Sequence, residues 1–182
     1  MSATPASSAS AAAPAPRGNL FVLMGVSGSG KTTIGELLAQ RLSIPFLDAD
    51  DYHPEANKAK MHAGHPLTDE DRWPWLATLN GLLRDHAQQG TGCVLACSAL
   101  KAIYRDKLEN GMPHGAIGFI LLEGSRDLIS SRLAARHHEF MSSTLLDSQF
   151  ATLEEPEDAF KICNDRTPDE VVDDILQQEH LA

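Results

Sequence analysis

Residues 25–32, which read GVSGSGKT, restrict the possible folds of this chain more than any other feature. They match the pattern of Gly, four residues, Gly, Lys and Ser or Thr, and they follow an apolar run at 20–24 that predicts a buried strand. Apolar residues at helical spacing continue from Thr33 to Leu42. A strand, a glycine-rich loop and a helix in this order are typical of a phosphate-binding loop, in which backbone N–H groups surround an anion.

We expect this loop to bind ATP. Lys31 would contact the β- and γ-phosphates and assist catalysis, and Thr32 would supply a hydroxyl to Mg²⁺. The alternative interpretation, a glycine-rich turn without a ligand, does not explain why every fixed position of the pattern is present in the right context. The expected nucleotide-binding residues are Gly25, Val26, Ser27, Gly28, Ser29, Gly30, Lys31, Thr32 and Thr33.

Length and composition indicate an ordinary globular protein. The 182 residues predict one domain, and the net charge of −10 argues against binding to nucleic acid or to an anionic membrane. Residues 1–18 are mostly Ala, Ser and Pro, so we expect a disordered tail before a single domain over 19–182. The sequence contains no run of about 20 apolar residues, which a membrane-spanning helix would need. Three cysteines without a short-range framework, and a start unlike a secretory signal, favour the cytoplasm.

Strand patterns alternate with helix patterns and predict a parallel sheet covered by helices on both faces, a three-layer α/β/α fold. The strand patterns lie at 20–24, 45–48, 93–97, 116–122 and 159–163. We expect Pro74 to interrupt and restart a helix that begins after Thr68. Ligands of such sheets bind beyond the carboxyl ends of the strands, which predicts one cleft surrounded by residues 25–32, 48–53 and 98–101.

Asp48 and Asp50 alternate at the end of the second predicted strand. Period-two geometry would point both carboxylates the same way, so that one could face the Mg²⁺ shell and the other an acceptor hydroxyl. The alternative interpretation is a solvated acidic loop, because Asp is also common in turns.

Several cations could neutralise substrate or transition-state charge. Lys101 and Arg105 are four residues apart on a predicted helix and could capture a substrate anion, or they could form an ordinary solvated face. Arg72 lies among acids, so its simplest interpretation is a surface ion pair. Arg132 and Arg136 lead into a polar segment that could carry them over ATP, or they could lie on an exposed helix.

Two classes of phosphate-loop protein are excluded by what the chain lacks. No Asp-x-x-Gly follows the loop, and residues 164–166 read NDR where a GTPase carries Asn-Lys-x-Asp. The place where nucleoside-monophosphate kinases usually carry Gly-x-Pro-Arg reads SALK at 98–101. The acceptor is therefore expected to be a small molecule, and Asp48 is the best remaining carboxylate for the metal.

The chain resembles the gluconokinases of the shikimate-kinase-like P-loop group from residue 20 to about residue 181. The resemblance rests on MGVSGSGKT at 24–32, DADDYHP at 48–54, PLTDEDRWPWL at 66–76, and CSALK with YRD at 97–106, with a weaker match, LLDSQFATLE, at 145–154. In the expected lid this chain reads RHHEF at 136–140, where many relatives read Arg-x-Gly-His-Phe, so His138 and Glu139 replace the usual Gly and His.

The resemblance implies a five-stranded parallel sheet in the order 2-3-1-4-5, a helical substrate-binding part and a lid over about 124–155. It implies transfer of the γ-phosphate of ATP to the 6-hydroxyl of D-gluconate, in an enzyme that is commonly a homodimer. Asp48 would lie in the Mg²⁺ shell, and Asp50 would orient or deprotonate the hydroxyl. The residues implied to hold the polyol acid are His53, Arg72, Lys101 and Arg105, and those implied to face phosphates are Arg132 and Arg136.

Two alternatives stay open from the sequence. One is a kinase for another small hydroxy acid or sugar. The other is a non-catalytic ATP-binding switch that signals to a protein partner, against which the cations of the acceptor side and the Asp48/Asp50 pair argue.

Overall fold

The sheet consists of five parallel strands. The structure is a computed structural model that describes residues 19–135, 143–157 and 159–178. The strands lie in the order β2-β3-β1-β4-β5, and every neighbouring pair is parallel, which confirms the predicted fold class. Their bounds are β1 Leu20–Met24, β2 Phe46–Asp48, β3 Cys93–Ala96, β4 Gly118–Glu123 and β5 Phe160–Cys163. The tail predicted over 1–18 lies outside the described residues.

Helices connect the strands as the sequence patterns predicted. Their bounds are α1 Lys31–Leu42, α2 Glu55–His62, α3 Asp69–Gln89, α4 Ala102–Glu109, α5 Arg126–Ala135, α6 Ser143–Thr152 and α7 Pro168–Gln178, with a 3₁₀ turn at Ala49–Tyr52. None of the helices in the described ranges combines the length and apolar character that a membrane span needs.

The predicted interruption at Pro74 is wrong, because α3 continues through it. Pro74 is the sixth residue of the helix, so the bond that it removes lies close to the amino-terminal end. A capping box fixes that end: the Thr68 hydroxyl accepts from the Asp71 N–H, and the Asp71 carboxylate accepts from the Thr68 N–H. Trp75 and Leu76 are buried directly after the proline, so packing outweighs the lost hydrogen bond.

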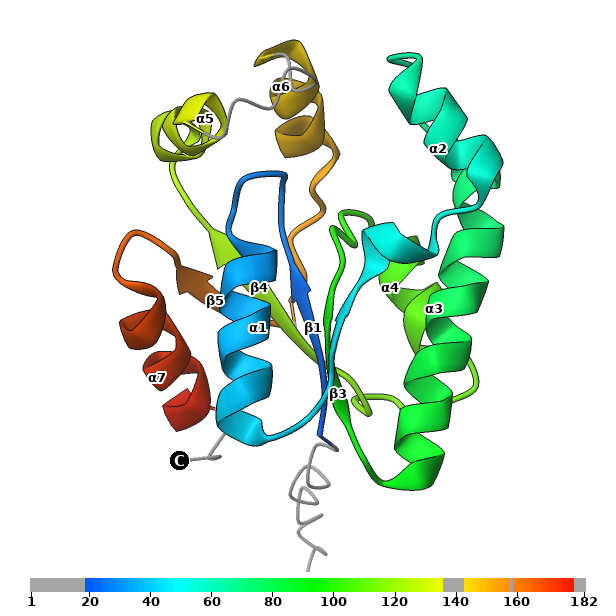
Figure 1. Cartoon of the computed structure of the whole chain (residues 1–182), viewed down its shortest axis with the longest axis vertical. Coiled ribbons are helices and arrows are strands. Elements are labelled where there is room, and N and C mark those ends of the chain that lie inside the picture. Colours follow the sequence, from blue (N-terminus) through cyan, green and yellow to red (C-terminus); the bar gives the residue numbers. More distant parts are fainter. Residues whose placement is uncertain (1–18, 136–142, 158, 179–182) are drawn as a thin grey trace, which may run out of the picture.

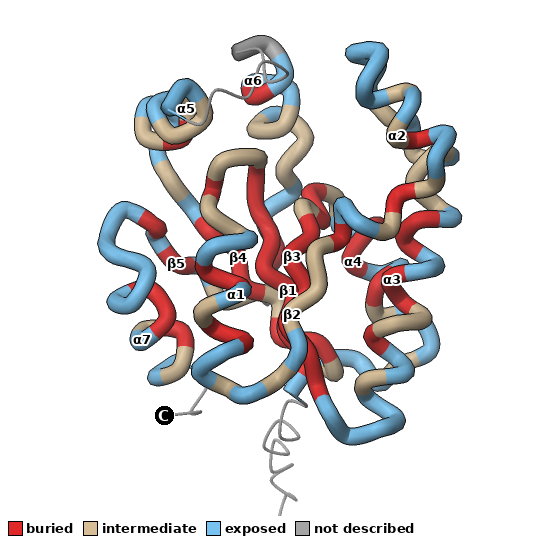
Figure 2. Tube along the Cα trace, in the orientation of Figure 1, coloured by how far each residue is buried: buried red, intermediate tan, exposed pale blue. Residues whose placement is uncertain are grey.

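The central strand β1 is buried along its whole length (Figures 1 and 2). Its side chains alternate between two cores. Val22 and Met24 pack into the core beneath α3 and α4. Phe21 and Leu23 pack into the core beneath α1 and α7 on the other face. The result is the predicted three-layer arrangement, with helices covering both faces of the sheet.

All five strands end at one edge of the sheet because they are parallel. Helices α5 and α6 lie beyond this carboxyl-terminal edge, above the loop that follows β1 (Figure 1). A small third core holds them there and joins α5 and α6 to residues of two loops, in the set Val26, Leu100, Ile129 and Leu146. The edge is thus the place where residues from separate parts of the chain meet.

Two helical glycines give a test of how tightly α1 packs on the sheet. A Cβ at Gly35 of α1 would lie 2.6 Å from Cε2 of Phe46, whereas a Cβ at Gly81 of α3 would meet nothing within 4 Å. Replacing glycine with alanine in a helix adds about 0.5–1 kcal/mol of stability, and overpacking costs about 1–3 kcal/mol. We therefore expect Gly35→Ala to lower the free energy of unfolding by about 1 kcal/mol and Gly81→Ala to raise it. Urea unfolding measures both, and equal effects of the two changes would contradict the packing described.

Candidate active site

The loop between β1 and α1 has the backbone that an anion site requires. Gly28 and Gly30 have φ values of 80° and 98°, in the region that favours glycine. A Cβ at Gly28 would lie 2.8 Å from Cγ of Leu133, and one at Gly30 would lie 2.3 Å from Nδ2 of Asn164. Helix α1 starts directly behind, and its N-cap residue, Gly30, has no side chain that could cap the first turn. The N-terminus of a helix in this position is a typical binding site for a phosphate.

Polar side chains in the same loop also suit a triphosphate. The Lys31 ammonium folds back and donates to the carbonyl oxygens of Gly25 and Val26, each at 3.0 Å. The Ser29 hydroxyl is buried and has no hydrogen-bond partner in the described part of the chain. A positive charge and an unsatisfied buried hydroxyl beside the N-terminus of a helix fit the phosphates of ATP.

Thr32 and Asp48 form a small oxygen-rich site beside the loop. The Thr32 hydroxyl donates to Oδ2 of Asp48 at 3.1 Å, and Oδ1 of Asp48 accepts from the Asp50 N–H at 3.0 Å. Among the described residues, no group of three or more His, Cys, Asp or Glu could hold a metal ion. Two protein oxygens fit Mg²⁺ best, since this ion keeps waters and takes substrate phosphates as further ligands.

The expected strand alternation of Asp48 and Asp50 is wrong. The strand ends at Asp48, and residues 49–52 form the 3₁₀ turn, so the capping hydrogen bond of Asp48 brings the two residues together. The Trp75 indole N–H fixes this turn by donating to the Ala49 carbonyl at 2.8 Å.

The Asp50 carboxylate has the character of a base. Its pKa is raised, first because the surrounding protein removes water from the carboxylate and then by the negative charge of Asp48. The positive charge of Lys31 lowers the pKa. Its side chain is nevertheless 88% exposed, so a ligand can reach it. A raised pKa in an accessible carboxylate is typical of groups that exchange protons.

His53 lies next to Asp50, and Arg72 is close enough to His53 for its charge to act on the ring. The His53 ring stacks on Trp75 with centroids 4.2 Å apart, and its Nε2 is 3.9 Å from Oδ1 of Asp50. Burial and the charge of Arg72 lower the pKa of His53 to about 4, so the ring is neutral at pH 7. Nδ1 of His53 and Nε of Arg72 are buried without a hydrogen-bond partner in the described ranges, which leaves two polar atoms for a ligand.

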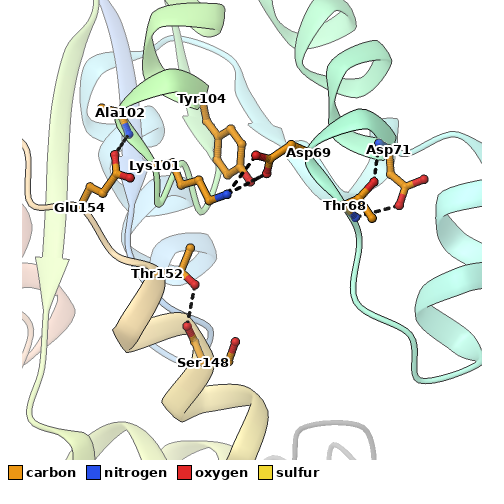
Figure 3. A network of polar contacts seen from close by, with 9 residues as sticks. All are labelled: Thr68, Asp69, Asp71, Lys101, Ala102, Tyr104, Ser148, Thr152 and Glu154. Carbon is orange, nitrogen blue, oxygen red and sulfur yellow. Dashed lines mark hydrogen bonds and ion pairs between the residues drawn. The ribbon is translucent and has the colours of Figure 1, made fainter.

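Lys101 and Arg105 do not lie on one helix as expected, because Lys101 is the N-cap residue before α4 and Arg105 lies within α4. The Lys101 ammonium binds both oxygens of Asp69, at 2.9 and 3.1 Å, and the Tyr104 hydroxyl donates to the same carboxylate (Figure 3). These contacts lower the pKa of Asp69. Arg105 is buried and donates to the carbonyls of Ala99 and Leu100, so it supports the loop that carries Lys101.

Of the two arginines expected to face phosphates, the structure describes only Arg132. Arg132 is half-buried in α5, the helix whose Ile129 and Leu133 lie against Gly28 of the loop. Arg136 lies outside the described residues, as do His138 and Glu139.

Three contacts of this site lie beyond the reach of sequence reasoning. The sequence indicates for Asp69 only an acid in the first turn of a helix, and no local pattern links it to Lys101. Gln149 of α6 accepts from the Ser27 N–H at 2.7 Å and donates to its hydroxyl at 3.1 Å. Asn164 donates to the Ser29 carbonyl at 2.7 Å. A sequence pattern reports neighbours within a few positions, whereas these partners are 32, 122 and 135 residues apart.

The parallel sheet and its phosphate loop, with a basic carboxylate and cations opposite, define a P-loop kinase. Residues 20–156 match the family model described as AAA domain. A gluconokinase of Arabidopsis thaliana is 43% identical over 173 residues, which cover 88% of this chain and 92% of that protein. The chain belongs to the gluconokinase family.

Two further relatives agree with this assignment. A probable gluconokinase of Dictyostelium discoideum is 47% identical over 141 residues, which cover 75% of this chain and 70% of that protein. The crystal structure of a gluconokinase from Sinorhizobium meliloti 1021 has a TM-score of 0.81 at 38% identity and covers 91% of this chain and 94% of that chain.

The lowered pKa of His53 predicts a pH-dependent stability. As the pH falls through 6.5 the unfolded chain binds a proton at this histidine, whereas the folded chain does so only near pH 4, so stability is lost between these values. Between pH 7 and pH 4.5 the free energy of unfolding of the wild type should fall by about 2 kcal/mol more than that of His53→Gln.

Urea unfolding at a series of pH values measures this difference, and the other titrating groups cancel when the two proteins are compared. His114→Gln is the control, because that side chain is 90% exposed, and it should keep the wild-type dependence. Parallel curves for wild type and His53→Gln would contradict the neutral, buried state of His53.

Proposed function

We propose that this kinase transfers the γ-phosphoryl group of ATP to the 6-hydroxyl of D-gluconate, giving 6-phospho-D-gluconate and ADP. The observation that carries the proposal is the position of Asp50. Its carboxylate interacts electrostatically with Lys31 of the phosphate loop and lies 3.9 Å from His53 of the acceptor side. A hydroxyl bound between these groups would face both a base and the transferred phosphoryl group.

On the nucleotide side, the residues hold and neutralise charge. The N–H groups of the loop and of the first turn of α1 bind the phosphates, and the Lys31 ammonium turns from the loop carbonyls toward the β- and γ-phosphates. Thr32 and Asp48 would hold Mg²⁺, and the bound ion would offset the charge that develops on the phosphates. Arg132 of α5 adds positive charge, and the same role is proposed for Arg136.

On the acceptor side, Asp50 orients the hydroxyl and takes its proton as the oxygen bonds to phosphorus and the bond to the ADP oxygen breaks. The raised pKa of Asp50 makes it a stronger base than an ordinary aspartate. The neutral His53 ring can donate to or accept from a hydroxyl without adding charge.

The acid group and the remaining hydroxyls of gluconate suit the cations and acids around Tyr104. Arg72 lies over the Tyr104 ring at 5.5 Å, and Lys101 lies at the same distance from it. Either cation can bind the gluconate carboxylate, and Asp69 can accept from sugar hydroxyls while it holds Lys101. Arg105 contributes by fixing the backbone of residues 99 and 100.

A coupled assay of ADP release tests the proposed substrate. Gluconate should stimulate release strongly, and shikimate, other sugar acids and nucleoside monophosphates should not. If a different hydroxy acid or sugar stimulated release instead, that compound would be the substrate in place of gluconate. Nucleotide-dependent binding of a protein partner without any stimulated release would instead identify a non-catalytic switch.

Two substitutions test the assigned roles in the same assay. Lys31→Ala should nearly abolish turnover, because it removes the cation at the phosphates. Asp50→Asn should lower kcat by about 10²-fold or more while the Kd for ATP changes little, since loss of a general base costs about 10²–10⁴-fold. Near-wild-type turnover of Asp50→Asn would remove Asp50 from the mechanism.

The magnesium role of Asp48 predicts a change in metal dependence. Asp48→Asn keeps an oxygen for Thr32 but removes the negative charge, so the Mg²⁺ concentration that gives half-maximal turnover should rise about tenfold at fixed ATP. Asp51→Asn is the matched control, because Asp51 is exposed in the same turn. An unchanged Mg²⁺ requirement in Asp48→Asn would place the metal elsewhere.

We further propose that the enzyme is a cytoplasmic homodimer, with one kinase domain over 19–182 and a lid over about 124–155. Cys93 and Cys97 are buried, and burial raises the pKa of each thiol to about 12, which suits reduced cysteines.

A further inference from the structure

The side chain of Gln149 makes a two-point contact with the rim of the phosphate loop. Its Oε1 accepts from the backbone N–H of Ser27 at 2.7 Å, and its Nε2 donates to the Ser27 hydroxyl at 3.1 Å. One carboxamide thus binds both the backbone and the side chain of a single loop residue. The two residues are 122 positions apart in the sequence, so the contact depends on how α6 is placed over the loop.

Helix α6 is held firmly enough to place this carboxamide. At its carboxyl end, the Glu154 N–H donates to the Leu100 carbonyl at 2.8 Å, and the Glu154 carboxylate accepts from the Ala102 N–H at 2.6 Å (Figure 3). Near its amino end, Asp147 accepts two hydrogen bonds from Arg126 of α5. Gln149 lies between these attachments.

The loop residue that Gln149 binds directly precedes a glycine with positive φ. Gly28 follows Ser27 with a φ of 80°, and the chain there can rotate into conformations that turn its N–H groups away from an anion. On the other side of Gly28 along the chain, Asn164 holds the Ser29 carbonyl at 2.7 Å. Gln149 and Asn164 therefore hold the loop from opposite sides of Gly28.

We propose that Gln149 is a positioning residue for phosphoryl transfer, which orients the Ser27 peptide and so prepares the phosphate loop for ATP. Without this contact, binding of ATP would also have to order the loop, and affinity would fall by that cost. The role of Gln149 in phosphoryl transfer rests on the proposed function. Its effect on ATP binding does not, because ATP binding can be measured without an acceptor.

The chemistry of the contact suggests a discriminating pair of variants. Gln149→Ala removes both hydrogen bonds. Gln149→Glu keeps two oxygens that Ser27 can donate to, but its negative charge would repel the triphosphate. Once protonated, the carboxyl group of the Gln149→Glu variant has one acceptor and one donor, like the original carboxamide, so acid should restore the function of this variant.

A calorimetric titration with ATP in the absence of gluconate gives the Kd for ATP and tests the proposal. At pH 8 we expect the Kd for ATP to rise about tenfold in Gln149→Ala, the loss of roughly 1.4 kcal/mol, and by more in Gln149→Glu. Between pH 8 and pH 5, the Kd of Gln149→Glu relative to wild type should fall severalfold, and that of Gln149→Ala should stay constant. Gln88→Glu, which adds the same charge on an exposed part of α3, should bind ATP within about twofold of wild type.

Two results would overturn the proposal. If Gln149→Ala bound ATP as tightly as the wild type, the contact would serve only the packing of α6. If it bound ATP more tightly, the carboxamide would occupy the place of a phosphate and would have to leave. Thermal unfolding of each variant verifies that it is folded. A failure of gluconate to stimulate ADP release would leave these ATP affinities unaffected, so the two proposals fail separately.

Discussion

The parallel pairing of β1 on both sides is the constraint on which the rest of the structure depends. Because β3 and β4 flank β1 in the same direction, the loop after β1 leaves the sheet at its centre, beside the ends of its neighbours. The buried side chains of β1 join the two cores, so the origin of the loop is fixed by most of the apolar packing of the domain. The phosphate site therefore has a rigid base, and precise placement can be achieved by a few polar contacts around it.

Those contacts organise the charges of an acidic protein around a site for anions. Asp69 holds Lys101 and Tyr104, and Asp48 holds Thr32 and the turn that carries Asp50. Each acid fixes a group to which we assign a role in the proposed function. The net charge of −10 is thus compatible with binding ATP and a sugar acid, because local pairing and the loop N–H groups decide the potential that a ligand meets.

Local patterns predicted the elements well where the signal and the physical cause were both local. The strand before the loop, the helix start after Thr68 and the glycine positions all follow from interactions within a few residues. Pro74 misled because the stability of α3 comes from packing of Trp75 and Leu76 on the sheet, which propensity does not include. The alternation of Asp48 and Asp50 failed because a hydrogen bond between these two residues ends the strand in favour of a 3₁₀ turn.

The sequence by itself determined the phosphate loop, the alternation of strands and helices, and a set of candidate residues, since these depend on backbone geometry and short spacing. Only the tertiary structure decided which candidates act together. It paired Lys101 with Asp69, turned Arg105 toward backbone carbonyls, and placed Gln149 against Ser27. The physical reason is that hydrogen bonds and ion pairs form between atoms within about 3 Å, and folding brings together residues that the chain separates by up to 135 positions.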